Sequence, residues 1–282
     1  MSYQQYSPMG FKLLPPVVKN LLIINFLFYL ATLSLGSAFN IDLGDKLGLH
    51  FVTASKFQPY QVITYMFMHA NFTHVFFNMF AVWMFGYALE NYWGGKRFLI
   101  YFLVTGMGAA LIHYLVMYFL EISPVLKAVD FFLANPDIGK FRDFIHSPYF
   151  IVNSEIKMRF DEFSTAYNTI AYRDPERGLQ LAIDFMVFYK TAFINAPVVV
   201  GASGAVFGIL LAFGMLFPNT LIYLYFFIPI KAKWFVIVYG AIELYTGITD
   251  RGSDVAHFAH LGGMLFGFIL LMIWKRRPFK SY

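Results

Sequence analysis

One serine, Ser203, stands in a glycine-rich stretch (residues 201–204) that opens an apolar segment continuing to Phe217. A serine hydroxyl acts as a nucleophile when a neighbouring base takes its proton. Two histidines, His257 and His260, lie in a second apolar segment and are the candidate bases. They are one helical turn apart, so both could face the same neighbour, and spacing alone does not choose between them. These residue types predict serine hydrolysis carried out inside a membrane.

His74 and Asn78 form another polar pair inside an apolar segment. Lying four residues apart, they project from one face of a helix, and both carry N–H donors. Such side chains avoid hydrocarbon unless they face a protein interior or a wet cavity. They either hydrogen-bond to a neighbouring helix or form an oxyanion hole, which stabilises negative charge on a reacting carbonyl oxygen. His69, five residues before His74, is expected to order the loop above this helix.

Two pairs of glycines accompany the candidate serine and bases. Gly204 and Gly208 form one GxxxG face, and Gly263 and Gly267 form another. Small faces allow two helix backbones to approach closely within a membrane. The sequence therefore predicts that the helix of Ser203 docks against the helix of the histidines, which would bring hydroxyl and imidazole within hydrogen-bond reach.

The composition indicates a membrane protein. Hydrophobic residues make up 59% of the 282 residues, the mean hydropathy is +0.60, and 13% of residues are charged, against roughly 25% in soluble proteins. Cysteine is absent, which excludes disulfides, thiolate catalysis and cysteine-bound metal. The formal net charge of +5 is attributed to membrane topology, because no basic stripe with interleaved aromatic residues indicates nucleic-acid binding.

Other intramembrane chemistries fit the sequence less well. It contains no H-E-x-x-H zinc motif and no pair of aspartates within the apolar segments. A metal site built only from histidines is conceivable, but we expect no carboxylate within the spans to support it. Its candidate ligands would be His69, His74, His257 and His260. We therefore expect neither a metal nor another cofactor.

The apolar segments predict an all-α polytopic membrane protein with six spans. Each span needs roughly 20 mostly apolar residues. The expected spans lie near residues 17–39, 70–90, 98–120, 192–217, 234–248 and 256–274. The chain then divides into residues 1–120 with the first three helices, an insertion at 121–191, and residues 192–282 with helices four to six and a basic tail. The first span exceeds the length of a signal-peptide core, so we expect it to remain as an anchor.

The placement of Lys and Arg in the short loops predicts the orientation. If six spans alternate, one side carries ten basic residues and the opposite side carries only Lys46, Lys56 and Arg251. Basic residues concentrate in cytoplasmic loops. Both termini are therefore expected in the cytoplasm, and the insertion outside it.

The insertion is too polar to be a span, because residues 121–190 hold ten acidic and eight basic residues. Apolar residues at helical spacing predict one amphipathic helix, and Asp174-Pro175 predicts the start of a second. We expect a small helical cap that packs either on itself or on the membrane surface. The apolar positions are Ile156, Phe160, Phe163, Tyr167 and Ile170, followed by Leu181, Phe185 and Phe188.

Taken in order along the chain, these motifs resemble the rhomboid family of intramembrane serine proteases. The spacing His69-x4-His74-x3-Asn78 is similar to the motif on the second helix of that family. Residues 201–208 are similar to the nucleophile motif on its fourth helix. Residues 259–263 are similar to the base motif on its sixth helix, which selects His260 over His257. The turn from Glu90 through the glycines at 94–95 to residues 97–98 is also similar.

The resemblance covers about residues 17–120 and 192–274, with two departures. Residues 57–64 stand where many relatives have Pro-Trp-Arg. The stretch between the third helix and the nucleophile is usually short in the family, whereas here it holds some seventy extra residues. The second departure weakens any inference about substrate access on that side, and leaves the catalytic motifs in place.

The resemblance implies a Ser–His dyad without a third, acidic residue. Ser203 would attack the scissile carbonyl while His260 takes its proton and later gives it to the leaving amine. The Ser203 backbone N–H, His74 and Asn78 would hold the oxyanion. Phe207, one turn after Ser203, either packs on the His260 ring or fills the core. Gly201, His69 and His257 remain candidate supporting residues.

The implied substrates are transmembrane helices, cut near their extracytoplasmic ends within the lipid bilayer. The main alternative is a catalytically silent rhomboid-like protein that binds client helices without cutting them, although such proteins typically lack the serine or the histidine. A channel that uses the polar residues as a pathway is a third hypothesis. The expected location is the plasma (inner) membrane, with a compact chain that fits a bacterium. The sequence does not specify an oligomeric state.

Overall fold

The computed structural model describes residues 12–224, 227–250 and 256–276. The chain divides into two compact units. The helix-bundle unit contains the residues up to Leu47, then Val62–His113, and the residues from Val200 onward. The aromatic unit contains Gly48–Gln61 and Tyr114–Val199.

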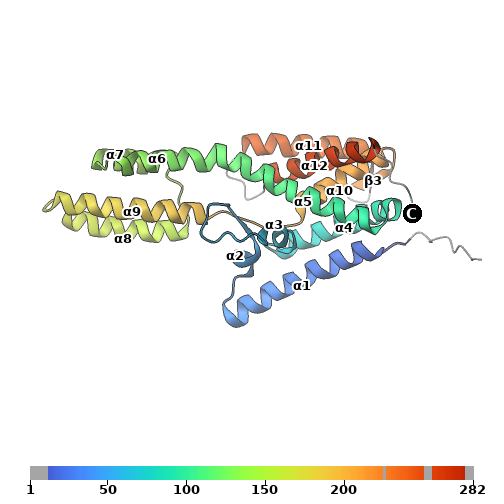
Figure 1. The fold of residues 1–282 in the computed structure, drawn as a ribbon, viewed down its shortest axis with the longest axis horizontal. Helices are drawn as coiled ribbons and strands as arrows, with labels where there is room; N and C mark the ends of the chain where they lie inside the picture. Colours follow the sequence, from blue (N-terminus) through green and yellow to red (C-terminus); the bar gives the residue numbers. More distant parts are fainter. Residues whose placement is uncertain (1–11, 225–226, 251–255, 277–282) are drawn as a thin grey trace, which may run out of the picture. The chain divides into compact units, whose positions relative to one another are not determined.

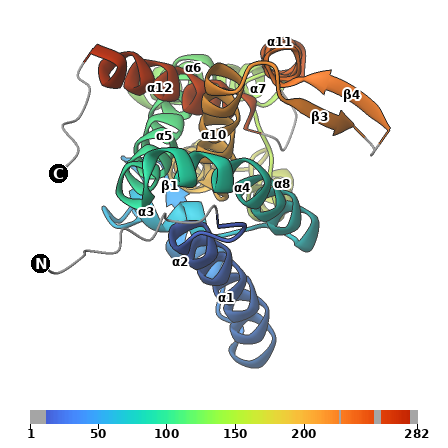
Figure 2. The same ribbon diagram turned by 90° about the vertical axis from the view of Figure 1, so that its right-hand side faces the viewer.

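The helix-bundle unit contains all the polar residues on which the sequence analysis focused. Within it α10 packs against α4, α11 and α12, and α1 packs against α4. The strands β3 and β4 form an antiparallel hairpin with Leu221 opposite Lys231, seen beside α11 in Figure 2. The elements in chain order are α1 (Pro16–Phe39), α2 (Leu43–Leu47), η1 (Tyr65–Phe67), α4 (Phe72–Trp93), α5 (Gly95–Met117), α10 (Ser203–Leu216), β3 (Leu221–Leu224), β4 (Ile228–Lys231), α11 (Ala232–Thr249) and α12 (His257–Arg276); the short α3 (Gln61–Thr64) and the end of α5 extend into the other unit (Figure 1).

A carboxylate on α4 fixes the start of α1. The side chain of Glu90 accepts hydrogen bonds from the backbone N–H groups of Val17 and Val18, at 3.0 and 2.7 Å. These N–H groups have no partner within their own helix, and a negative charge is favourable at a helix N-terminus. Pro16 at the first helical position lacks an N–H, which suits it to this place. A buried acid thus ties two apolar helices together.

The helix α4, which carries His74 and Asn78, has defined ends. The side chain of Asn71 accepts a hydrogen bond from the backbone N–H of His74 at 2.9 Å, a common helix N-cap. The helix ends before Gly94, whose φ of 79° is a left-handed value that favours glycine. The cap fixes where the first turn begins, and therefore the direction in which His74 projects.

The aromatic unit has a core of its own, built largely from phenylalanine and tyrosine. Its helices α8 and α9 lie against each other (Figure 1). The strand β1 pairs antiparallel with β2, so that Leu49 lies opposite Val199. The helix α9 starts at Pro175 with Asp174 as its N-cap, as the sequence predicts. The elements are β1 (Leu49–His50), η2 (Tyr118–Ile122), α6 (Ser123–Ala134), α7 (Ile138–Ile145), α8 (Ser154–Ile170), α9 (Pro175–Asn195) and β2 (Val198–Val199).

Buried rings fill the centre of the aromatic unit. Phe185 contacts the rings of Phe141 and Phe163, with centroids 6.1 and 5.2 Å apart. The Tyr189 hydroxyl, on a buried ring, accepts a hydrogen bond from the Ile151 backbone N–H at 3.0 Å. Burial raises the pKa of this tyrosine to about 12, because it disfavours the phenolate. These contacts form within the unit, which accounts for the amphipathic pattern in the sequence.

Four helical stretches are long and apolar enough to cross a membrane, by length and composition. They are Pro16–Phe39, Phe72–Trp93, Gly95–Ala134 and His257–Lys275, and Ser203–Leu216 is a shorter apolar helix. The mainly helical membrane architecture is therefore confirmed, whereas the count of six spans stays a prediction. The helix expected at 98–120 continues through η2 and α6 as far as Ala134, so the chain does not leave it at residue 121.

The fourth expected span differs most from the structure. The sequence predicts an apolar segment from Ala192 to Phe217, but α9 ends at Asn195 and α10 begins only at Ser203. Pro197 cannot donate a backbone hydrogen bond, and Gly201 adopts a φ of 121° that is outside the helical region. This interruption is what brings Ser203 to the very start of a helix.

Candidate active site

The central feature of the site is a hydrogen bond between two helices. Ser203 is the first residue of α10, and its Oγ lies 2.9 Å from Nε2 of His260 on α12. The His260 side chain is buried, with 8% of the residue exposed. A hydroxyl in contact with an unprotonated imidazole nitrogen is the arrangement that activates a serine nucleophile.

Glycines permit this contact because α10 and α12 approach without intervening side chains. A Cβ atom built on Gly263 would lie 1.8 Å from the carbonyl oxygen of Gly204, closer than any real side chain could be. One built on Gly267 would lie 3.4 Å from Cα of Gly208 and 2.3 Å from the Tyr101 hydroxyl. The four glycines from the sequence analysis thus lie at close helix contacts. Gly204 and Gly208 also face α5, on which they abut Ala109 and Thr105.

His74 and Asn78 converge on the backbone just before the serine. A Cβ on Gly201 would lie 2.6 Å from Cε1 of His74 and 3.8 Å from Nδ2 of Asn78. The backbone N–H of Gly201 donates to the carbonyl of Tyr65 at 2.9 Å, which holds the strand-like approach to α10 in place. Two side chains with N–H donors therefore lie beside the residues leading into Ser203.

Asn78 has an unused donor. Its Nδ2 atom is buried and has no hydrogen-bond partner among the described residues. An unpaired buried N–H costs free energy, so natural proteins rarely keep one without a use for it. The Ser203 backbone N–H lies in the first turn of α10, where no intrahelical acceptor is available. Both donors can serve an oxyanion that forms at Ser203.

Two further predicted residues lie next to the pair. The Phe207 ring stacks on the His260 imidazole, with centroids 4.2 Å apart and planes 6° from parallel. The His69 ring meets that of His74 edge to face at 5.0 Å. Burial, reinforced by the neighbouring His74, lowers the pKa of His69 from its ordinary value of 6.5 to about 4. His69 is therefore neutral at physiological pH.

An acidic residue that the sequence analysis missed lies behind the histidines. Oε2 of Glu243, on α11, is 2.8 Å from Nδ1 of His260 and 2.7 Å from Nδ1 of His257. The expectation of no carboxylate near the histidines within the apolar segments is therefore wrong. The signal was present in the sequence, because Glu243 is the one acid between Trp234 and Ile248. An ionisable residue in such a segment is a functional candidate by itself.

These three residues also form the metal-binding candidate of the described ranges. One ligand atom each from Glu243, His257 and His260 lie within 4.8 Å of one another. Carboxylate oxygen and imidazole nitrogen suit zinc and other divalent ions. His69 and His74, the other histidines of the conceived metal site, are not members of this cluster.

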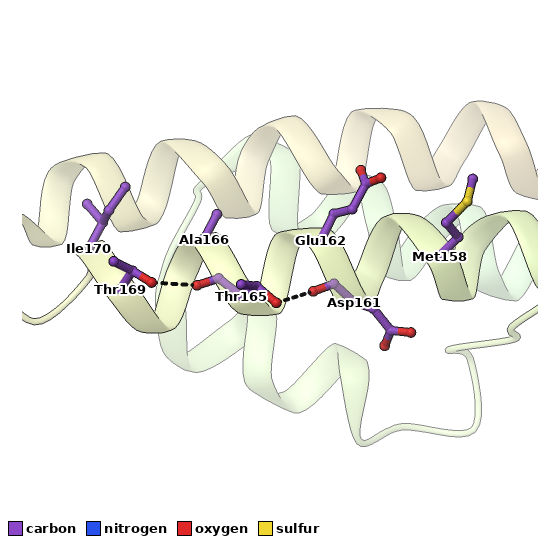
Figure 3. A pocket seen from close by; sticks show the side chains of 7 residues that line it. All are labelled: Met158, Asp161, Glu162, Thr165, Ala166, Thr169 and Ile170. Atoms are coloured by element: carbon purple, nitrogen blue, oxygen red, sulfur yellow. Dashed lines mark hydrogen bonds between the residues drawn. The ribbon is translucent and has the colours of Figure 1, made fainter.

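A surface hollow of about 710 Å³ lies in the aromatic unit, along α8 (Figure 3). Its lining contains none of the candidate catalytic or oxyanion residues. The hydroxyls of Thr165 and Thr169 there donate to backbone carbonyls of their own helix, at 2.9 Å each. The hollow is open, and its polar groups are those of an ordinary solvated helix face. The candidate catalytic residues all lie in the helix-bundle unit.

The chain matches a known protein family over the segments that carry these residues. The model of the rhomboid domain matches residues 56–123 and 178–277. The chain is similar to RHOMBOID-like protein 1 of Arabidopsis thaliana, with 41% identity over 94 residues, 33% of this chain and 23% of that protein. It is also similar to an uncharacterised mitochondrial rhomboid protein of Schizosaccharomyces pombe, with 37% identity over 84 residues, 27% of this chain and 21% of that protein.

The matched segments span less than a quarter of either relative. Both relatives are eukaryotic, so they lend no support to the bacterial plasma membrane expected from the sequence. The domain match covers more than half of the chain, and it contains Ser203, His260, His74 and Asn78. The chain therefore belongs to the rhomboid family, as a multi-pass protein of the lipid bilayer.

Proposed function

We propose that this rhomboid-family protein is an intramembrane serine endopeptidase, which hydrolyses peptide bonds in or near the transmembrane helices of other membrane proteins. The observation that carries the proposal is the 2.9 Å contact between Ser203 Oγ and His260 Nε2. In this hypothesis the hydroxyl gives its proton to Nε2 as Oγ attacks the scissile carbonyl. The same proton then passes to the leaving amine. A water molecule then gives a proton to His260 and attacks the acyl group on Ser203, which releases the acid and restores the serine.

The oxyanion of this reaction would be held by the Ser203 backbone N–H together with His74 and Asn78. The Nδ2 of Asn78, which has no partner among the described residues, supports this role, because a free donor is available to a charge that appears only during reaction. Losing one such donor typically costs roughly 10²–10³ in rate. We expect Asn78→Ala to lower activity by less than Ser203→Ala does, because His74 and the backbone N–H remain.

The substrate has to unwind locally before it can react. The carbonyls of an intact helix are already hydrogen-bonded within the helix and are therefore shielded from attack. Transmembrane segments with small or helix-weakening residues near one end satisfy this condition. We infer that cleavage occurs near the extracytoplasmic end of the substrate, with both termini of the enzyme in the cytoplasm and the polar segment 121–191 outside it.

A silent protein that binds client helices is the competing hypothesis. It would use the same bundle without chemistry, and it predicts no serine reactivity. The pairing of Ser203 with His260, together with the unused donor of Asn78, favours the enzyme, because a binding protein has no need for an activated hydroxyl.

Labelling of the detergent-purified chain with a fluorescent fluorophosphonate tests the proposal without knowledge of the substrate. We expect the wild type to be labelled, Ser203→Ala and His260→Ala to remain dark, and His257→Ala to keep much of the signal. His257 contacts Glu243 and Thr246 rather than the serine, so comparing the two histidine variants shows which imidazole is the base. Folded wild type that stays as dark as Ser203→Ala would favour the silent binding protein.

A further inference from the structure

Glu243 is a buried carboxylate that the proposed reaction does not yet use. It lies in the middle of α11, an apolar helix, with 5% of the residue exposed. An ionised carboxylate in such a place is costly unless it is paired and hydrogen-bonded. Its position is therefore informative about what its partners do.

The partners of Glu243 form a chain that ends at the serine. Its Oε2 lies 2.8 Å from Nδ1 of His260, whose Nε2 lies 2.9 Å from Oγ of Ser203. An ionised carboxylate only accepts hydrogen bonds, so Nδ1 of His260 carries the proton. In a neutral ring Nε2 is then bare and can accept the proton of the hydroxyl. The carboxylate thus selects the ring form that a general base needs.

His257 holds the carboxylate itself, and Thr246 lies beside His257. Nδ1 of His257 lies 2.7 Å from the same Oε2, and 3.1 Å from Oγ1 of Thr246. The Thr246 hydroxyl donates to the Ile242 carbonyl at 2.8 Å, so its oxygen is a second, longer acceptor for the same His257 N–H. Two N–H donors therefore converge on one oxygen, which satisfies the charge and leaves the Glu243 side chain little freedom to turn away.

Hydrogen bonding describes these contacts better than a metal site does. Separations of 2.7 and 2.8 Å are those of charge-assisted hydrogen bonds. Two ligands bound tetrahedrally to zinc at about 2.0–2.1 Å would be roughly 3.3 Å apart. In addition, His260 is engaged at both ring nitrogens, by Glu243 and by Ser203.

We propose that Glu243 is a positioning residue of the active site, which makes a Ser203–His260–Glu243 triad out of the expected dyad, with His257 as a second anchor for the carboxylate. The inference rests on the proposed function. When Oγ bonds to the carbonyl carbon, the carbonyl π electrons move to oxygen and the hydroxyl proton moves to Nε2. The C–N bond then breaks and that proton leaves with the amine. Glu243 stays ionised throughout and stabilises the imidazolium.

The test compares Glu243→Gln and Glu243→Asp with Glu90→Gln in the full-length chain. Glu90 is the matched control, because it is also a buried carboxylate on an apolar helix but serves the start of α1. We expect Glu243→Gln to slow fluorophosphonate labelling by roughly 10²–10⁴-fold, the contribution of a positioned acid–base system. We expect Glu90→Gln to keep the wild-type rate. Glu243→Asp should recover part of the loss because it keeps the charge.

A second measurement does not depend on activity. In a Ser203→Ala background, nitrogen-15 NMR of labelled histidine reports which ring nitrogen of His260 carries the proton. We expect the proton on Nδ1 with Glu243 or Asp, and a shift toward Nε2 with Gln, whose amide can donate to Nδ1. A silent wild type with this signature would reject the proposed function and leave the positioning role standing.

Three results would overturn the triad. One is a Glu243→Gln variant that labels at the wild-type rate with an unchanged histidine spectrum. Another is a Glu243→Asp variant no better than Glu243→Gln in both measurements, which would indicate a packing role. The third is loss of wild-type labelling on treatment with a chelator, which would assign Glu243, His257 and His260 to a metal ion instead.

Discussion

The ring of Phe207 lies flat against the imidazole of His260, with ring centroids 4.2 Å apart and planes 6° from parallel. Phe207 is one turn after Ser203 on α10, so the helix that carries the serine also carries the ring that packs on the His260 base. The Phe207 ring also contacts Tyr239 of α11, with ring centroids 4.9 Å apart. The imidazole is therefore fixed by a ring on its face and by hydrogen bonds at both nitrogens.

Replacing the Phe207 ring should reduce activity without unfolding the protein. Phe207→Leu keeps an apolar side chain but removes the flat contact, so the imidazole can rotate away from the serine. We expect labelling to slow roughly 3- to 10-fold, because aromatic pairs contribute about 0.5–1.5 kcal/mol beyond their burial. Phe213→Leu is the matched control, since Phe213 is buried on the same helix but packs against Phe85 and Phe217. Equal losses in the two variants would show that the Phe207 contact has no special role.

Gly201 should be essential for a reason that can be separated from backbone strain. Its φ is 121°, and a Cβ there would strike His74; Gly94 also has a positive φ, 79°, but its added Cβ would meet nothing within 4 Å. Either substitution by alanine strains the backbone, at a cost of about 1–2 kcal/mol. We expect Gly201→Ala to lose most fluorophosphonate labelling and Gly94→Ala to keep it, with similar losses in melting temperature. If Gly94→Ala were equally inactive, strain alone would explain the effect.

His69 should make the folded state sensitive to acid. Its pKa is about 4 in the folded protein and 6.5 ordinarily, so between these values the unfolded chain binds a proton that the folded chain does not. Stability is therefore fully present above pH 6.5, falls as the pH drops through this window, and loses no more from this group below pH 4. The loss from His69 is on the order of 3 kcal/mol.

Thermal unfolding of His69→Gln between pH 7 and pH 4 measures this contribution. We expect the melting temperature of the variant to fall less steeply than that of the wild type over that range. His146 is exposed, so His146→Gln serves as the control and should follow the wild type. A His69→Gln curve parallel to the wild type would mean that other groups cause the acid sensitivity.

Much of the candidate site could be predicted because it depends on local patterns. Polar residues are conspicuous in apolar segments, and helical spacing shows which of them share a face. The motif order identified the family through Ser203, His260, His74 and Asn78. Glycine pairs indicated where helices come close, and the structure has Gly263 against Gly204. Asp174-Pro175 predicted the start of α9 for the local reason that both residues suit a helix N-terminus.

Other features were decided only by tertiary structure. The sequence shows that Glu243 is an acid in an apolar helix, but its contacts with His257 and His260 depend on how α11 packs against α12. The apolar run from Ala192 to Phe217 looks like one span, yet Pro197 and Gly201 interrupt it and set Ser203 at a helix start. Periodicity determines the face on which a residue lies. The neighbour that the face meets depends on the packing of whole helices, which no local pattern records.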